Sequence, residues 1–312
     1  MMKEKAQDKI LDRDLYKTWV RLEYKDALEL LQEVINYGTI LLLRCLASSE
    51  KKLKDIVAIG VFFKHVLCML DTIEIMLSHC ASIGASLPLR SLFEDIIQVK
   101  YMMLKDFEYR ANAYYVWNIR QQRMWAGRAM LGDMKGEEIK EILKKEGNIT
   151  NIPITNISEE ELRKIVTTLT AILGKPKFKD IDARYEEDYK KKKYDQAWYK
   201  MTGINSLKKI AREVGFEAGY LLEYSMLSGI AHGTFMVNQV RQSERDFTIE
   251  PIRQIDNIKR ICSSSISLSL ELYMQFIDYY RKSERPDFDA KYLQEWKSRH
   301  KKLYEKQTKP NK

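Results

Sequence analysis

Apolar residues recur at helical spacing along most of this chain, and few residues interrupt the pattern. Over residues 12–46, 52–82 and 107–130, an apolar side chain occurs at every third or fourth position, as on one face of an α-helix. The sequence has 312 residues but only 13 Gly and 6 Pro, so residues that break helices are scarce. It contains no sustained alternation of period two. These features predict an all-α fold, a bundle of long helices.

Glycine and proline predict where the helices of the first third end. Gly38 is expected to interrupt the first helical segment, and Gly84 is expected to stop the second. Pro88 suits the first turn of the next helix, where its missing N–H is not needed. The helix that follows it, over residues 89–103, is apolar on most sides and should lie at the centre of the core.

The middle of the chain, residues 132–200, has a different composition. It is polar and charged, and it is interrupted by Gly147, Pro153, Gly174 and Pro176. Ser158 followed by Glu161 fits a capping box at the start of one modest helix. We predict that this segment is an insertion of short helices that decorates the bundle and offers a surface for a partner.

The last third resumes the helical pattern. We expect helices over 206–235 and 252–280, with a short extended piece at Phe247 to Ile249. A basic tail follows, and its residues are expected to form a solvated, frayed terminus: Lys297, Arg299, Lys301, Lys302, Lys306, Lys309 and Lys312. The chain is thus divided into 1–131 (N-terminal bundle helices), 132–200 (insertion) and 201–312 (C-terminal bundle helices and basic tail).

Charge, cysteine usage and hydropathy indicate the possible binding partners and the cellular compartment of the protein. The net charge of +9 favours nucleic acid or an anionic surface without selecting either. The four cysteines have neither C-x-x-C spacing nor a nearby cluster of histidines that would suggest zinc, so we expect small core residues: Cys45, Cys68, Cys80 and Cys262. No secretion leader is visible, and the longest apolar stretch, 57–70, is broken by Lys64 and His65. We expect a cytoplasmic protein without membrane contact, metal or cofactor.

Two short polar motifs stand out from the apolar helices. Arg90 and Glu94 are four residues apart, and so are Tyr224, Ser228 and His232 in turn. Residues four apart lie on the same face of a helix, so each motif forms one polar stripe. Polar groups in an otherwise buried stripe must find partners or a ligand. These residues are therefore the candidate site.

Two interpretations of the motifs stay open. In the first, the helix that carries Arg90 and Glu94 faces the helix that carries His232, and the residues form one pocket. In the second, Arg90 and Glu94 form an ion pair within their helix, and His232 ends its helix beside Gly233.

Asp71 and Glu74 are further candidates for the edge of this pocket. They lie three apart on a neighbouring predicted helix and would bind a cation only together with Glu94. A single available histidine and scattered carboxylates make a weak metal signal, so no metal site is predicted.

The helix predicted over 107–130 interleaves aromatic and basic residues. Arg120, Arg123 and Arg128 are interleaved with Trp117 and Trp125, which suits either the stacking of nucleic-acid bases or a packed stripe with arginines on the outer face. We favour the packed stripe, because aromatic residues at helical spacing usually serve packing.

Two runs of residues resemble a known bacterial family. The first runs from LDTIE at 70–74 through LRSLFE at 89–94 to Tyr101-Met102 and Arg110-Ala111. The second comprises Trp198 and residues 220–233, with the pattern Tyr-x-x-x-Ser-x-x-x-His-Gly. Over about residues 55–235 the chain looks like a bacterial domain family of unknown function.

That family is in turn similar to the HEPN superfamily, whose members often act as RNA-cutting toxins or defence effectors. Active members place an Arg and a His close together on one helix. Here the nearest arginine before His232 is Arg212, so a site of this type would have to use Arg90 from another helix.

Two functions follow as alternatives. The first is a helical module that binds RNA or another protein, in a bacterial defence or toxin setting. The second is a metal-independent ribonuclease, in which His232 moves a proton, Arg90 stabilises the phosphorane and Glu94 orients them. Tyr224 and Ser228 would then be supporting hydrogen-bond partners. Helical bundles often pair, so a homodimer is one expectation.

Overall fold

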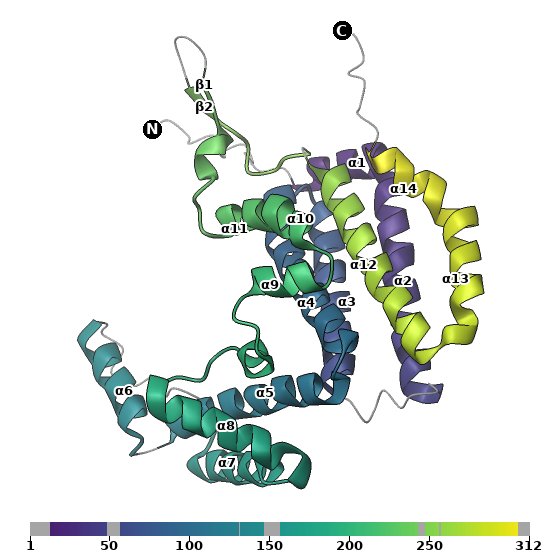
Figure 1. The fold of residues 1–312 in the computed structure, drawn as a ribbon. Helices are drawn as coiled ribbons and strands as arrows, with labels where there is room; N and C mark the ends of the chain where they lie inside the picture. The colour runs from purple at the N-terminus through teal and green to yellow at the C-terminus, as the bar shows by residue number, and fades with distance from the viewer. Residues whose placement is uncertain are drawn as a thin grey trace, which may run out of the picture. The chain divides into compact units, whose positions relative to one another are not determined.

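The fold consists almost entirely of α-helices, as predicted (Figure 1). The structure, a computed structural model, describes residues 13–48, 57–130, 132–146, 157–242, 247–255 and 257–304. The chain divides into two compact units. The first comprises Met1–Lys105 with Leu207–Lys312, and the second comprises Asp106–Ser206.

The first unit is a bundle built from both ends of the chain. Its longer helices are α1 (Arg13–Glu23), α2 (Lys25–Ser48), α3 (Val57–Leu77), α4 (Ser82–Leu104) and α12 (Ile258–Tyr280). Shorter helices complete it: α9 (Leu207–Glu213), α10 (Glu217–Gly219), η3 (Tyr220–Tyr224), α11 (Ser225–Ala231), η4 (Met236–Gln239), η5 (Lys282–Glu284), α13 (Arg285–Lys291), η6 (Tyr292–Trp296) and α14 (Lys297–Tyr304). A two-stranded antiparallel hairpin, β1 (Val240–Gln242) and β2 (Phe247–Ile249), precedes α12, and β2 matches the predicted extended piece.

The core of this bundle lies where α2, α3, α4 and α12 pack against one another. Helix α4 buries side chains around most of its circumference, including Leu89, Phe93 and Ile97, which fits its predicted central place. Apolar burial of this extent is the main contribution to stability. A central α4 gives its few polar side chains a fixed position.

The helix ends predicted from glycine and proline are wrong in three places. Helix α2 continues through Gly38. A side chain at this position would collide with the Tyr273 ring of α12, so the glycine permits close packing of the two helices. Gly84 and Pro88 both lie inside α4. The turn before α4 instead contains Cys80, which adopts a left-handed backbone with φ of 58°.

The second unit contains α5 (Phe107–Ala129), α6 (Met134–Glu146), α7 (Glu159–Leu173), α8 (Pro176–Lys192) and η2 (Trp198–Thr202). Helix α5 packs against α6, α7, α8 and η2. The predicted capping box is present, because Ser158 and Glu161 bond each other's backbone N–H. Two predicted interruptions, Gly147 and Pro153, lie outside the described residues.

The limits of the units differ from the division made at residues 131 and 200. Helix α5 buries its apolar stripe against the short helices of the charged segment, which places it in the second unit. Within the described residues, one segment, Lys25–Ala47, is long and apolar enough by length and composition to cross a membrane. An apolar core helix gives the same pattern.

Two further predictions need correction. Cys45, Cys80 and Cys262 are buried as expected, but Cys68 is exposed. The start of the basic tail is not frayed, because Lys297–Tyr304 forms helix α14, which packs on α2 and α12. Lys306, Lys309 and Lys312 lie outside the described residues.

Candidate functional site

Helix α4 supplies the first half of the candidate site. Arg90 donates through Nε to Glu94 Oε1 at 3.0 Å, an ion pair between residues one helical turn apart. The two side chains are 24% and 27% exposed, so they lie at the border between the core and the solvent. The buried face of α4 fixes both residues while leaving their charged ends accessible.

Elements η3 and α11 supply the second half. Residues Tyr220–Tyr224 form a π-helical turn that leads directly into α11. Such turns are rare in proteins, and many of those that occur lie at functional sites. Within this turn the Tyr220 and Tyr224 rings stack, with centroids 4.7 Å apart and planes inclined by 21°.

Helix α11 ends at His232. Gly233, with φ of 71°, donates to the Ile230 carbonyl, and the Thr234 amide donates to the Gly229 carbonyl at 2.9 Å. These two bonds make a Schellman motif, in which a left-handed glycine closes the helix. Gly229 also leaves room for the Phe235 ring, which a side chain at residue 229 would meet. The backbone therefore holds the exposed His232 side chain at a fixed point.

The structure brings the two halves together. Arg90 donates through NH2 to the Tyr224 hydroxyl at 3.2 Å, and its NH1 lies 3.4 Å from His232 Nε2. Tyr224 in turn donates to Glu94 Oε1 at 2.9 Å. We call Arg90, Glu94, Tyr224 and His232 the Arg90 cluster. The ion pair and the helix end of the second interpretation are both present, but within one composite site.

Protonation in the Arg90 cluster follows from its contacts. A guanidinium only donates, so in this contact Nε2 of His232 is the acceptor, which corresponds to the tautomer with the proton on Nδ1. Burial, together with the bond to Glu94, raises the pKa of Tyr224 to about 12, so its hydroxyl keeps its proton at neutral pH. Partial burial opposes the charge of Arg90, but bonds with Tyr224 and Glu94 outweigh it and raise the Arg90 pKa.

The remaining predicted site residues have other surroundings. Glu74 accepts a hydrogen bond from Gln32 of α2 at 2.7 Å, and Asp71 is exposed on α3. Ser228 contributes its carbonyl to the His232 amide, within the helix. These contacts do not include the Arg90 cluster. The described part of the chain also contains no group of His, Cys, Asp and Glu that could hold a metal.

Sequence reasoning missed two aromatic residues of the site. Phe93 of α4 packs against Tyr224, with ring centroids 5.7 Å apart. Tyr220 stacks on the same Tyr224 ring. Tyr220 could have been found, because it lies four residues before Tyr224 and extends the same helical stripe. Phe93 gave no such signal, since it lies within an apolar run.

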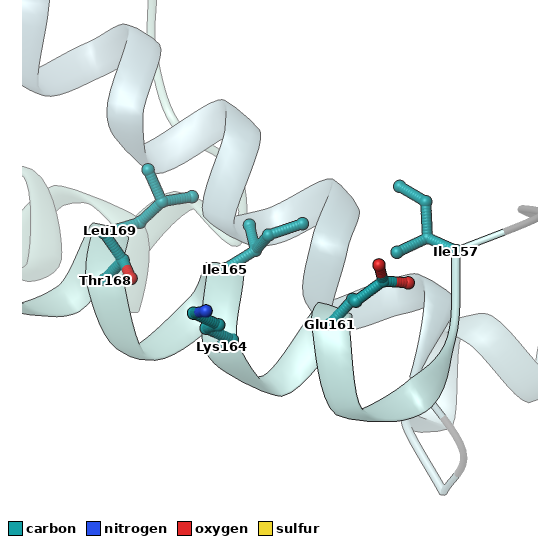
Figure 2. Close-up of a pocket in the computed structure, with 6 residues that line it drawn as sticks. All are labelled: Ile157, Glu161, Lys164, Ile165, Thr168 and Leu169. Atoms are coloured by element: carbon teal, nitrogen blue, oxygen red, sulfur yellow. The ribbon is translucent and has the colours of Figure 1, made fainter.

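A separate open pocket of about 680 Å³ lies on α7 of the second unit. Figure 2 shows Ile165 and Leu169 in a row along the helix, with Ile157 beside Glu161. The Glu161 carboxylate is already bound by the Ser158 backbone and hydroxyl in the capping box. This pocket contains no residue of the Arg90 cluster and offers no comparable group of polar side chains.

The chain matches a known protein family. A model described as a family of unknown function, DUF5677, matches residues 55–248, which is more than half of the chain. The matched span includes the whole Arg90 cluster, and the predicted resemblance to a domain of unknown function is confirmed. The comparison with curated proteins gave no match, and neither did the comparison with solved structures.

Proposed function

The chain belongs to the family of unknown function DUF5677, and we propose that it is a metal-independent endoribonuclease that uses the Arg90 cluster. One observation carries the proposal: a fixed guanidinium lies 3.4 Å from the imidazole of an exposed histidine. A cation beside a neutral base is what cleavage at the 2′-hydroxyl of RNA needs. The similarity to HEPN ribonucleases, an expectation from the sequence motifs, would imply the same chemistry.

In the proposed reaction, His232 acts as the general base. A scissile phosphate takes the NH1 donor of Arg90, which frees Nε2 of the neutral His232 to accept a proton. Nε2 takes this proton from the 2′-hydroxyl, and the 2′-oxygen attacks phosphorus. The bond from phosphorus to the 5′-oxygen breaks, and that oxygen takes a proton from solvent. The products carry a 2′,3′-cyclic phosphate and a 5′-hydroxyl.

Arg90 would stabilise the negative charge that develops on the phosphorane oxygens. Glu94 and Tyr224 are positioning residues in this scheme, because they hold the Nε and NH2 edges of the guanidinium. With Nε and NH2 held, NH1 is the donor that exchanges His232 for a phosphate. Preorganised donors of this kind need little rearrangement during the reaction.

The test is cleavage of a fluorescently labelled single-stranded RNA in buffer that contains EDTA. We expect the wild type to cut, and His232→Ala and Arg90→Ala to lower the rate by at least about 100-fold. Matched controls are His79→Ala, whose ring bonds within its own helical turn, and Arg163→Ala, an exposed arginine of the second unit. RNA with a 2′-deoxy nucleotide at the cleaved position should resist cleavage.

Three results would overturn the proposal: no cleavage of RNA by the wild type, cleavage that stops in EDTA, or unchanged cleavage by a folded His232→Ala variant. Melting temperatures of all variants show whether they are folded. In cells, induced expression of the wild type should fragment RNA and slow growth, as expected of a toxin or defence effector, and the two variants should not.

A binding module without catalysis is the second candidate. The observation that favours it is that Nε, NH1 and NH2 of Arg90 each already have a partner. In that case the wild type would bind RNA or a protein without cutting RNA. Arg90→Ala would then lower the melting temperature strongly, as expected when a structural polar group loses its partner.

A further inference from the structure

An aromatic stripe leads away from the Arg90 cluster along α4. It consists of Phe216, Tyr220 and Tyr224, which follow one another at four-residue spacing from the N-cap of α10 to the end of η3. Phe216 and Tyr224 both pack on Phe93, with ring centroids 6.2 Å and 5.7 Å away. Gly219 permits this approach, since a side chain there would press on the Phe93 ring at 3.1 Å. The stripe therefore rests directly on α4.

Tyr220 occupies the outer position of this stripe. Its ring stacks on Tyr224 at 4.7 Å, and it is only half-buried. The Tyr224 hydroxyl is bound within the Arg90 cluster, so Tyr224 is fixed and provides a firm support for the second ring. A tyrosine held in this way offers a flat, rigid surface at little cost in conformational entropy.

Cations lie at both ends of the stripe. Arg90 lies over the Tyr224 ring, with Cζ 5.3 Å from its centroid, and Lys100 Nζ lies 5.1 Å from the centroid of Phe216. Arg90 and Lys100 both belong to α4, and ten residues of helix span about 15 Å. Each of the two cations also has a carboxylate partner at 3.0 Å, Glu94 for Arg90 and Glu271 for Lys100. Rings flanked by positive charge suit a chain of stacked bases and phosphates.

We propose that Tyr220 is a base-stacking platform, and that the substrate of the Arg90 cluster is single-stranded RNA whose base beside the scissile phosphate stacks on Tyr220. This inference rests on the proposed function. Unpaired bases expose their faces, whereas the bases of a duplex are stacked on one another. The platform therefore selects single-stranded over double-stranded RNA, and it does so without a preference for base sequence.

Binding of an oligonucleotide that cannot be cut tests the platform. The probe is a short, single-stranded 2′-O-methyl RNA with a fluorescent label, titrated by anisotropy at constant salt. Tyr220→Ala should weaken binding by about 5- to 150-fold, as expected for the loss of one stacked base. Tyr220→Trp should retain the affinity. Tyr194→Ala, which removes an exposed tyrosine of the second unit, serves as the matched control.

An abasic scan separates stacking from a structural effect. Removing one base at a time from the probe should weaken binding by the wild type at one position, and this dependence should be absent in Tyr220→Ala. Tyr220→Leu keeps apolar contact with Tyr224 but lacks a flat ring, so it should behave as the alanine variant does. A loss that is equal at every abasic position, or unchanged affinity in a folded Tyr220→Ala, would overturn the inference.

The binding assay is independent of cleavage, so the two proposals can fail separately. If the protein binds the probe through Tyr220 but cuts no RNA, the platform stands and the ribonuclease proposal is wrong. If it cuts RNA through His232 while Tyr220 has no effect on binding, the ribonuclease proposal stands and the platform is wrong. A double-stranded probe that competes equally well also contradicts the platform.

Discussion

Two arginines, one in each compact unit, differ in their burial and in their hydrogen-bond partners. The Arg90 side chain is 24% exposed, and it bonds one carboxylate, one hydroxyl and one imidazole. The Arg120 side chain is 5% exposed, and it bonds three carboxylates, those of Asp182, Glu186 and Asp195. A buried charge persists only when opposite charges and hydrogen bonds compensate it, and Arg120 meets that condition fully.

This difference indicates which of the two arginines can bind a phosphate. Three carboxylates around one guanidinium leave an excess of negative charge, so the surroundings of Arg120 repel an anion. Burial opposes the charge of Arg120, but its bonds to Asp195 and Asp182 outweigh this and raise its pKa. Arg90 has a single carboxylate partner, Glu94, and it lies near the surface. An anion can therefore join the Arg90 cluster without meeting excess negative charge.

The largest expected effect is that of Arg120→Met on stability. This change leaves three carboxylates beside one another, with the buried Asp195 side chain deprived of its cationic partner, and removing one partner of a buried pair costs about 3 to 5 kcal/mol. Urea unfolding measures the loss, and hydrogen exchange should place it in α5 and α8. The control is Arg163→Met, an exposed arginine of the same unit, which should cost less than about 0.5 kcal/mol. Equal losses in the two variants would contradict the structural role of Arg120.

Lysine replacements sharpen the comparison further. Arg120→Lys keeps the charge but loses the planar fork that bonds several oxygens at once, so we expect a loss of about 1 to 3 kcal/mol. Arg90→Lys should change the free energy of unfolding by no more than about 0.5 kcal/mol. Thermal unfolding of both variants measures the difference. If Arg90→Lys proves the more damaging to stability, the comparison is wrong.

The helices were predictable because a periodic apolar pattern is a local property. That pattern identified α5, but it did not reveal which of its arginines would be buried. Arg120 was expected on an outer face, which is wrong, because Asp182, Glu186 and Asp195 converge on it from α8 and the segment after it. Their positions depend on how α8 packs, and no local spacing encodes this.

The Arg90 cluster was predictable in its halves but not in its assembly. Four-residue spacing placed Arg90 with Glu94, and Tyr224 with His232, because helical geometry fixes such neighbours. That the halves meet depends on the packing of α11 against α4 and on Gly233, which ends α11 at His232. Asp71 and Glu74 were grouped with the site on weaker spacing evidence, and α3 turns Glu74 toward Gln32 instead. The catalytic roles stay predictions.

A smaller effect on stability is expected from Arg90→Gln. Its ion pair is partly exposed, so its loss should cost less than about 1 kcal/mol, while RNA cleavage should be lost. Chemical unfolding and the cleavage assay on the same sample measure both. A loss of stability as large as that of Arg120→Met would instead favour a structural role for the Arg90 cluster.

The smallest effects on stability are expected from two histidines of the first unit, one of which is exposed and the other buried. His65 is exposed and bonds Asp95 at 2.6 Å, and this bond raises the pKa of His65. His300 is buried between α14 and α12, near Ser263 and Ser267, and burial lowers its pKa.

The signs of their pH dependence are opposite. The contribution of His65 is full below its unfolded pKa of about 6.5 and is lost as the pH rises through its higher folded pKa. The contribution of His300 is full above the same unfolded value and is lost as the pH falls toward its lower folded pKa. Urea unfolding from about pH 5 to 8 measures both. His65→Gln should flatten only the alkaline side of the stability profile, and His300→Gln only the acidic side, because each removes one titrating group. If either variant flattens the other side, the environment assigned to that histidine is wrong.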